Sequence, residues 1–371
     1  MSFLTSLIWN PPLSFAQNGR APESKVCYIG TYTKKEGHVD GKAEGIYSVS
    51  MDAKTGALRF GSTLAVITNP SFVKTSPDGE FLYAVSELGP KDASSGEIYS
   101  YKILPDNNLK LLSSLPTNGL APCNIEVDPS GNFVFVANYL GGVVTMYQKN
   151  TDGSLEEKQV ITLENKENSH PHSVTISEDN STAYIADLGN DRIWIFDLDT
   201  EKGRLQPHQQ PYIALETGAG PRHFTLSGDG EYAYSMNELN STVSVFRILE
   251  NGGLDLLQNI SSLPKDFKEK NSGADIHLHP SGEFLYVSNR GHNSIAIFKV
   301  DEASGRLKTV GHADTRGRTP RNFAIAPRGE FLFVANQDSG NISSFKIDEQ
   351  SGELEFMESL EIPTPVCIEF K

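Results

Sequence analysis

The sequence of 371 residues is poor in cysteine and has no long apolar run. Its three cysteines, Cys27, Cys123 and Cys367, include no CxxC pair, so they predict neither a disulfide framework nor a zinc knuckle. No segment approaches the roughly 20 apolar residues that cross a bilayer, and we expect no membrane partner. Lys and Arg number 32 against 47 Asp and Glu, and the resulting net charge of −15 argues against nucleic acid as a partner.

Several catalytic motifs are also missing from the sequence. It contains no G-x-S-x-G nucleophile elbow, no HExxH and no P-loop, so we expect no cofactor. A metal-dependent enzyme would need a cluster of carboxylates, and arginines are interleaved among the candidates. We therefore expect no metal at the four acidic residues that might form such a cluster, Glu87, Asp187, Glu238 and Asp275.

Glycine and proline are abundant, at 32 and 20 residues, and they mark a repeat of about fifty residues. Each repeat opens on a short segment that usually contains proline, and a tight hairpin with an aromatic-rich alternating strand follows. The segments lie 45 to 52 residues apart; they are Asn69-Pro70-Ser71, Ala121-Pro122-Cys123, His170-Pro171-His172, Gly220-Pro221-Arg222, Ser272-Gly273-Ala274, Thr319-Pro320-Arg321 and Thr364-Pro365-Val366.

Four short strands in each repeat are typical of a propeller blade. Six repeats are complete, whereas the seventh has only residues 364–370, and its three missing strands are at residues 26–30, 45–49 and 57–60. Pairing the C-terminal strand with these N-terminal strands closes the ring and removes its open edges. The sequence thus predicts an all-β, seven-bladed propeller with four antiparallel strands per blade. Cys27 and Cys367 should lie on adjacent strands as buried side chains.

Residues 1–24 do not match the repeat, so we expect a leader ahead of one propeller domain, residues 25–371. Ser14-Phe15-Ala16 resembles a signal-cleavage site, but no charged region precedes it, and Asn10-Pro11-Pro12 interrupts the apolar stretch. These features favour a cytoplasmic protein with a disordered leader. Export to the periplasm is the alternative.

Charged side chains gather at one end of the predicted channel. Because the strands of a blade alternate in direction, the start of the first strand and the turn between the second and third strands share a face. This face receives His172, Arg222, His223, Arg321 and Asn322 from the first strands, and Asn237, Glu238, Arg290 and His292 from the turns. Buried charges must pair or bind a ligand, so two readings follow: a ring of salt bridges between blades, or a ligand site, which we prefer.

The same motifs resemble those of the seven-bladed β-propeller lactonase family. They are FLYVSNRGHNSI (residues 284–295), His170-Pro171-His172, Gly220-Pro221-Arg222-His223-Phe224, Asn237-Glu238-Leu239 and Thr319-Pro320-Arg321-Asn322-Phe323, within a resemblance that covers about residues 25–371. The family includes 6-phosphogluconolactonases and carboxy-cis,cis-muconate cyclases. The resemblance implies catalytic roles for His172, Arg222, Glu238 and Arg290.

The chemistry of lactone hydrolysis fits these residue types. His172 or Glu238 could deprotonate water, while Arg222 and Arg290 could stabilise an oxyanion or clamp a carboxylate or phosphate. We expect Arg222→Ala to disturb folding very little. His223, Arg321, Asn322, His292 and Asn237 are the predicted substrate-binding residues.

The predicted function is therefore that of a metal-independent carboxylic-ester hydrolase acting on a small anionic lactone, a phosphorylated or carboxylated sugar lactone. A muconate-type cycloisomerase would use the same residues, and a non-catalytic propeller that binds a ligand or another protein is the third reading. The oligomeric state is not predicted.

Overall fold

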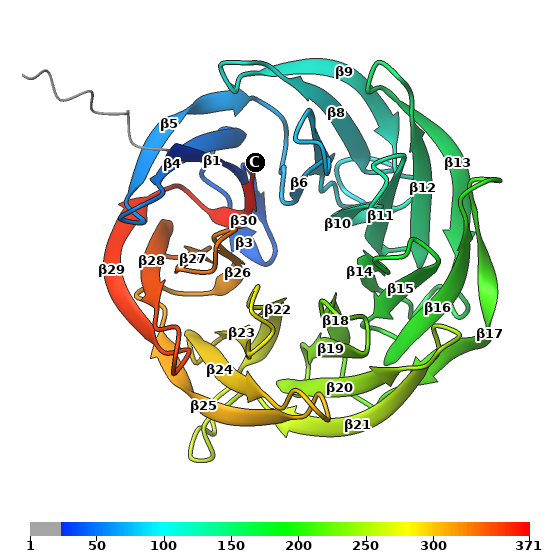
Figure 1. Ribbon diagram of the computed structural model, residues 1–371. Helices are drawn as coiled ribbons and strands as arrows, with labels where there is room; N and C mark the ends of the chain where they lie inside the picture. The colour runs from blue at the N-terminus through cyan, green and yellow to red at the C-terminus, as the bar shows by residue number, and fades with distance from the viewer. Residues whose placement is uncertain (1–23) are drawn as a thin grey trace, which may run out of the picture.

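Seven four-stranded antiparallel sheets form a closed ring around a central channel in the computed structural model, which describes residues 24–371 (Figure 1). The predicted seven-bladed propeller is thus confirmed. None of the described residues belongs to a helix long and apolar enough to span a membrane. The predicted leader lies, up to residue 23, outside the described residues.

We number the blades from the first complete repeat. Blades 1 to 3 are formed by β6 (Val73–Thr75), β7 (Phe81–Ser86), β8 (Glu97–Ile103) and β9 (Leu109–Pro116); β10 (Leu120–Val127), β11 (Phe133–Leu140), β12 (Val143–Lys149) and β13 (Leu155–Thr162); and β14 (Pro171–Ile176), β15 (Thr182–Asp187), β16 (Arg192–Asp199) and β17 (Arg204–Ala214).

Blades 4 to 6 repeat this arrangement. They are formed by β18 (Pro221–Leu226), β19 (Tyr232–Asn237), β20 (Thr242–Ile248) and β21 (Leu254–Ser261); β22 (Ser272–Leu278), β23 (Phe284–Arg290), β24 (Ser294–Val300) and β25 (Leu307–Asp314); and β26 (Pro320–Ile325), β27 (Phe331–Asn336), β28 (Asn341–Ile347) and β29 (Leu354–Glu361).

Blade 7 joins the two ends of the chain. Its strand order is β30 (Pro365–Phe370), β1 (Ser24–Thr31), β4 (Ile46–Asp52) and β5 (Leu58–Ala65). The closing pair is antiparallel, with Cys27 opposite Phe370 and Gly30 opposite Cys367. Both cysteines are buried, as predicted. This pairing removes the free edges that an open ring would expose.

A short hairpin that the sequence pattern did not predict interrupts blade 7. Between β1 and β4 the chain forms β2 (Lys35–Glu36) and β3 (Val39–Asp40), which pair with each other. In Figure 1 this hairpin projects towards the centre of the ring. It therefore lies where it can narrow the mouth of the channel.

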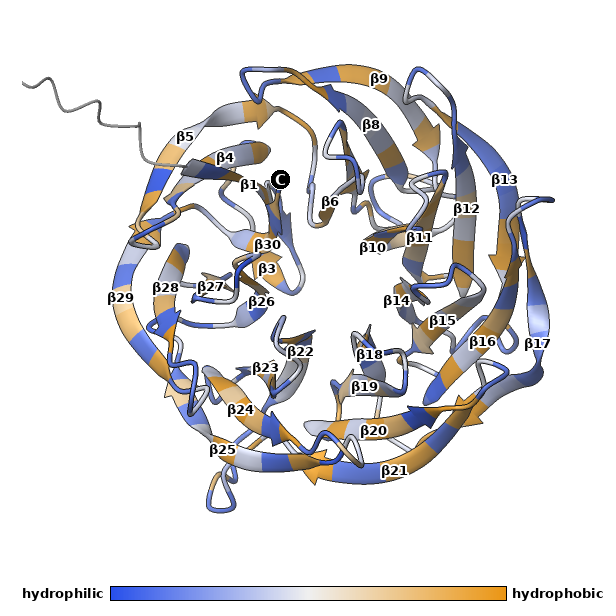
Figure 2. Cartoon of the chain, in the orientation of Figure 1, coloured by the Kyte–Doolittle hydropathy of each residue, from blue (hydrophilic) through white to orange (hydrophobic). Residues whose placement is uncertain are grey.

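The hydrophobic core lies between neighbouring blades. The second strands β7, β15, β19 and β27 are buried at every position because both of their faces pack against other strands. One cluster, for example, joins Phe284 and Tyr286 of blade 5 to Phe323 and Leu332 of blade 6. The outermost strands, such as β9 and β21, alternate between hydrophobic and hydrophilic residues (Figure 2).

Tyrosines of the second strands also tie each of three blades to the next. The hydroxyl groups of Tyr184, Tyr234 and Tyr286 donate hydrogen bonds of 2.8, 3.1 and 2.8 Å to carbonyl oxygens in the outer hairpin of the following blade. The acceptors belong to the hairpin glycines Gly252, Gly305 and Gly352. These aromatic side chains are core residues, as predicted, and they add a polar link between blades.

Two tyrosine-to-phenylalanine changes test this link. Tyr286→Phe should lower the free energy of unfolding by about 1 kcal/mol, because it removes a buried hydrogen bond. Tyr83→Phe is the matched control, since the Tyr83 hydroxyl is buried without a partner among residues 24–371, and its loss should cost nothing. Chemical denaturation of both variants measures the difference, and equal losses of stability would contradict the assignment.

Candidate active site

Backbone hydrogen bonds bring the first strand and the turn after the second strand together at one mouth of the channel. The carbonyl oxygen of the residue before the proline accepts a hydrogen bond from a backbone N–H of the turn. The bond from Glu87 N to Asn69 O is 3.0 Å long, and that from Glu238 N to Gly220 O is 2.7 Å long. The residue before the proline often adopts a positive φ, which is 59° at the β-branched Thr319. Side chains from the two segments are therefore held next to each other.

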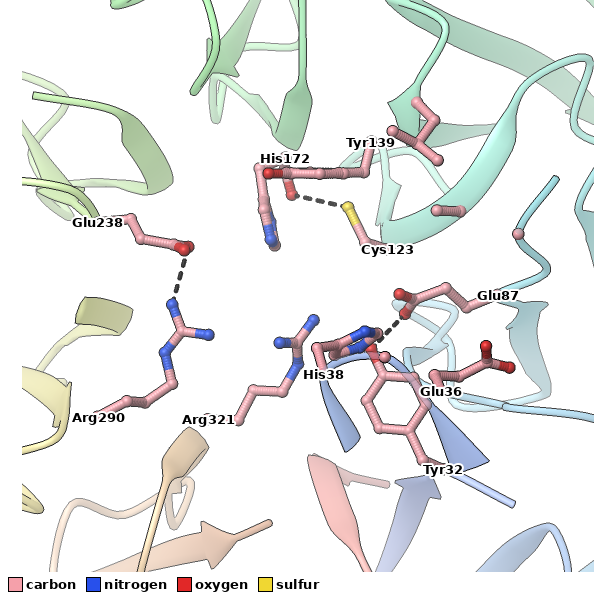
Figure 3. Close-up of a pocket in the computed structure, with 14 residues that line it drawn as sticks. Tyr32, Glu36, His38, Glu87, Cys123, Tyr139, His172, Glu238, Arg290 and Arg321 are labelled. Atoms are coloured by element: carbon pink, nitrogen blue, oxygen red, sulfur yellow. Dashed lines mark hydrogen bonds and ion pairs between the residues drawn. The ribbon is translucent and has the colours of Figure 1, made fainter. Parts of the chain in front are cut away.

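A cavity of about 400 Å³ opens at this mouth, and every blade contributes to its wall (Figure 3). Its lining combines arginines, carboxylates, histidines and tyrosines. The complete lining is Tyr32, Glu36, Gly37, His38, Glu87, Gly89, Ala121, Cys123, Tyr139, Leu140, His172, Glu238, Arg290 and Arg321. Of the four predicted catalytic residues, the cavity thus contains His172, Glu238 and Arg290.

The carboxylate of Glu238 lies between two arginines. Its Oε2 is 3.0 Å from Arg222 Nε and 2.8 Å from Arg290 Nη2. Burial raises the pKa of Glu238, but the charges of Arg290 and Arg222 outweigh this and bring the pKa below its usual value of 4.5. Glu238 is therefore ionised at neutral pH, and it occupies the place between Arg222 and Arg290 where the sequence suggested a ligand anion.

Arg222 itself lies behind the cavity wall. Its side chain is 2 % exposed, and its Nη1 donates to the carbonyl oxygen of Ala274 at 2.8 Å. It does not line the cavity. It acts on the cavity through its contact with Glu238 and through its charge, which lowers the pKa of His172.

His172 is held in its neutral form. Burial, together with the charge of Arg222 and the neighbouring His223 and Arg321, moves the pKa of His172 well below 6.5. Its Nδ1 is buried without a hydrogen-bond partner among residues 24–371. The ring contacts Tyr139 edge-on, with 5.7 Å between centroids. A neutral imidazole of this kind can accept a proton.

Arg321 differs from the other two arginines because its guanidinium has no acceptor among residues 24–371. It forms neither a hydrogen bond nor an ion pair of 4.0 Å or less within the described part of the chain. Its guanidinium lies over the ring of Tyr32, 5.5 Å from the centroid. Burial lowers its pKa, but Tyr32, Glu87 and Glu238 raise it above the usual value. Arg321 therefore brings an unpaired positive charge into the cavity.

The opposite wall is formed by residues that the sequence reasoning did not select. Glu87 accepts a hydrogen bond of 2.8 Å from the hydroxyl of Tyr32, and Glu36 of the hairpin accepts one of 3.1 Å from Asn69 Nδ2. His38 packs edge-on against Tyr32. Glu87 occupies the same position in its repeat as Glu238, and this equivalence could have identified it. For the hairpin, the sequence offered only the long connection after the first N-terminal strand.

Comparisons with known proteins identify the family of the chain. The sequence profile described as "Lactonase, 7-bladed beta-propeller" matches residues 26–370. The chain belongs to this family. It is 36 % identical to a 6-phosphogluconolactonase of Formosa agariphila over 80 % of this chain and 85 % of the relative. It is 33 % identical to a 6-phosphogluconolactonase of Bacillus subtilis over 92 % of this chain and 97 % of that protein.

A solved structure resembles this chain over nearly its whole length. A periplasmic gluconolactonase of Pseudomonas aeruginosa superimposes with a TM-score of 0.86 at 32 % identity, and the match covers 94 % of this chain and 99 % of that one. The family resemblance read from the sequence motifs is thus confirmed.

Two predicted substrate-binding residues instead form links between blades. His223 Nδ1 lies 2.6 Å from Asp275 Oδ1, and Asn322 Nδ2 donates to Asp275 Oδ2 at 2.6 Å. Asn322 Oδ1 accepts from the backbone of Ile368 at 2.8 Å. Neither His223 nor Asn322 lines the cavity. For His223 and Asn322, the structure thus shows the links between blades that were the alternative to a ligand site.

Asn237 and His292, also predicted to bind substrate, lie outside the cavity as well. Asn237 Nδ2 donates to the hydroxyls of Thr242 and Ser244, and His292 Nδ1 is 2.7 Å from Ser294 Oγ. Their polar atoms stabilise the turns that carry Glu238 and Arg290.

The acidic residues weighed as metal ligands are dispersed. Asp187 accepts from the indole of Trp194, Glu238 pairs with arginines, and Asp275 is bonded to His223. Among residues 24–371, no three His, Cys, Asp or Glu side chains lie in an arrangement that could hold a metal ion.

The two arginines on equivalent first strands should differ in their effect on stability. Arg222→Met should destabilise the protein by about 3 kcal/mol, because it breaks a buried ion pair and two hydrogen bonds. This expectation replaces the one from sequence, in which loss of Arg222 hardly affects folding. Arg321→Met should change stability by less than about 1 kcal/mol, since only the contact with Tyr32 is lost.

Unfolding of the two variants in denaturant measures this difference. The same loss for both would contradict the distinction between a paired and an unpaired arginine.

Proposed function

We propose that the protein hydrolyses a sugar lactone in the mouth cavity, with His172 as the general base. One observation carries the proposal: a neutral histidine, an ionised glutamate and an unpaired arginine line a single small cavity. The names of the relatives, 6-phosphogluconolactonase and gluconolactonase, support the same reaction.

The first step is attack of water on the lactone carbonyl carbon. His172 accepts the proton of the attacking water, for which its uncharged ring is suited. The ionised carboxylate of Glu238 pairs with Arg222 and Arg290 at the cavity wall. Arg290, which Glu238 anchors at the cavity wall, donates to the carbonyl oxygen as it becomes negative.

The second step is opening of the lactone ring. The bond between the carbonyl carbon and the ring oxygen breaks, and the protonated His172 returns its proton to that oxygen. The products are a carboxylic acid, which loses its proton to solvent at neutral pH, and a hydroxyl group on the same open chain. His172 is neutral again, so the cycle needs no other reactant than water.

Arg321 is the best candidate to bind an anionic group of the substrate. Its guanidinium has no acceptor within residues 24–371, whereas Arg222 and Arg290 are both paired with Glu238. A guanidinium binds phosphate or carboxylate through two parallel hydrogen bonds. This geometry supports a phosphorylated or carboxylated lactone, with Arg321 taking the role that the sequence suggested for Arg222.

His172→Gln tests the reaction directly. With 6-phosphogluconolactone and gluconolactone as substrates, we expect the wild type to release acid and the variant to lose at least about a hundredfold in kcat, because the base is absent. A circular dichroism spectrum confirms that the variant is folded. Turnover of a carboxymuconate but of neither lactone would favour the cycloisomerase, and no turnover of any of them would favour the non-catalytic propeller.

The pH dependence of wild-type activity is a second test of His172 as the base. The base must be unprotonated, and the pKa of His172 is well below 6.5 in the free protein. The value of kcat/KM should therefore be level down to pH 6.5 and fall only in more acidic solution. A fall already centred at pH 6.5 or above would contradict a buried, neutral His172 as the base.

A further inference from the structure

A chain of buried polar contacts leads from the wall between blades 4 and 5 to the carboxylate of Glu238. Asp275 Oδ1 lies 2.6 Å from His223 Nδ1, and His223 Nε2 lies 3.1 Å from Arg222 Nη1. Arg222 Nε then lies 3.0 Å from Glu238 Oε2. Asp275, His223 and Arg222 do not line the cavity, so none of them is placed to contact a ligand there.

The chemistry of arginine fixes the tautomer of His223. A guanidinium offers only donors, so Arg222 Nη1 must donate to His223 Nε2, and that nitrogen carries no proton. The ring proton therefore lies on Nδ1 and is donated to Asp275. Asp275 thus holds the histidine with its acceptor nitrogen turned towards Arg222.

Asp275 is a rigid anchor for this arrangement. Besides His223, its carboxylate accepts from Asn322 Nδ2 at 2.6 Å, from His277 Nε2 at 3.0 Å and from the backbone N–H of Phe323 at 3.2 Å. Asn322 and Phe323 belong to blade 6, so the anchor joins three consecutive blades.

The orientation of Arg222 depends on its Nη1 atom. Although Nε lies close to Glu238, no aligned hydrogen bond joins the two, and Nε is otherwise without a partner in the described residues. The directed bonds of the guanidinium are those of Nη1, to His223 and to the carbonyl oxygen of Ala274. The position of the positive charge next to Glu238 is therefore set by His223 together with the carbonyl oxygen of Ala274.

The consequence for Glu238 is that one carboxylate oxygen is held and the other is free. Oε2 forms the ion pairs with both arginines, whereas Oε1 has no partner among residues 24–371. We propose that Asp275 and His223 are positioning residues, which orient Arg222 so that Glu238 presents one free oxygen to the reacting group in the cavity. This inference rests on the proposed lactonase function.

Two substitutions of His223 separate this role from a purely structural link between blades. In His223→Asn, the side-chain amide takes the place of Nδ1 and keeps the bond to Asp275, but Arg222 loses its acceptor. In His223→Gln, the amide oxygen takes the place of Nε2 and keeps the acceptor for Arg222, but the bond to Asp275 is lost.

We expect His223→Asn to lower kcat roughly 10- to 100-fold with KM nearly unchanged, as is typical of residues that orient a functional group. His223→Gln should retain more of kcat than His223→Asn. The opposite order, with His223→Gln the more impaired, would overturn the proposal, because it would show that only the link to Asp275 matters. Unchanged kcat in both variants would also overturn it.

The matched control is His279→Asn. His279 Nε2 lies 2.9 Å from the carbonyl oxygen of Gly329, so this histidine also joins two neighbouring blades, but it does so on the opposite face. The control variant should keep the kcat of the wild type. A loss of kcat equal to that of His223→Asn would mean that any weakened link between blades reduces activity, and would overturn the proposal.

Crystal structures of the two His223 variants give a result that does not depend on activity. We expect Arg222 and the Glu238 carboxylate to be displaced in His223→Asn and to keep their positions in His223→Gln. If the wild type hydrolyses no lactone, the proposed function is wrong. The displacement of Arg222 and Glu238 in the crystal structures still tests whether His223 positions them. An undisplaced Arg222 in His223→Asn would overturn that role.

Discussion

The pairing of Glu238 with Arg222 and Arg290 is the interaction on which the mouth of the channel depends. A buried guanidinium is costly unless it is paired and hydrogen-bonded, and Arg222 is among the largest fully buried side chains of the protein. One carboxylate pairs with both arginines and offsets one of their two positive charges. Among residues 24–371 this pairing includes Arg222 and Arg290 but not Arg321, whose side chain also lines the cavity.

The closed ring is what makes such a cavity stable. Each blade contributes only one or a few side chains to the wall, and their positions follow from the strand that carries each of them. Rigid strands place functional groups more accurately than loops do. The hairpin β2–β3 adds Glu36 and His38 from a connection, and the turns after β7 and β19 add Glu87 and Glu238.

Much of this arrangement could be predicted from the repeat alone. The spacing of the opening segments identified the blades, and the alternating strand directions placed His172, Glu238 and Arg290 at one mouth. The sequence reasoning gave Arg222 a catalytic role and Arg321 a binding role, but it did not show which of the two, in the same register on two first strands, is paired with a carboxylate. The difference arises in the turn of the same blade, where Glu238 follows β19 but Gln337 follows β27. Comparing the first-strand position with the turn position of the same blade would have shown which arginine has a carboxylate as its partner.

The hairpin β2–β3 could not have been predicted in this way. Its strands have two residues each, which is too short for an alternating pattern, and no other blade has an equivalent. The roles of His223 and Asn322 were also hidden, because a polar residue at the channel wall can face a ligand or a neighbouring blade. The choice depends on Asp275, which lies about fifty residues from both along the chain.

The most direct measurement of the central claim is a crystal structure of the protein with a non-hydrolysable lactam analogue of a phosphorylated sugar lactone. The account predicts that the analogue lies in the mouth cavity, with its ring carbonyl carbon facing His172, the carbonyl oxygen on Arg290 and the phosphate on Arg321. An analogue bound in the groove between blades 4 and 5 on the opposite face, near His279 and Asp301, would contradict it.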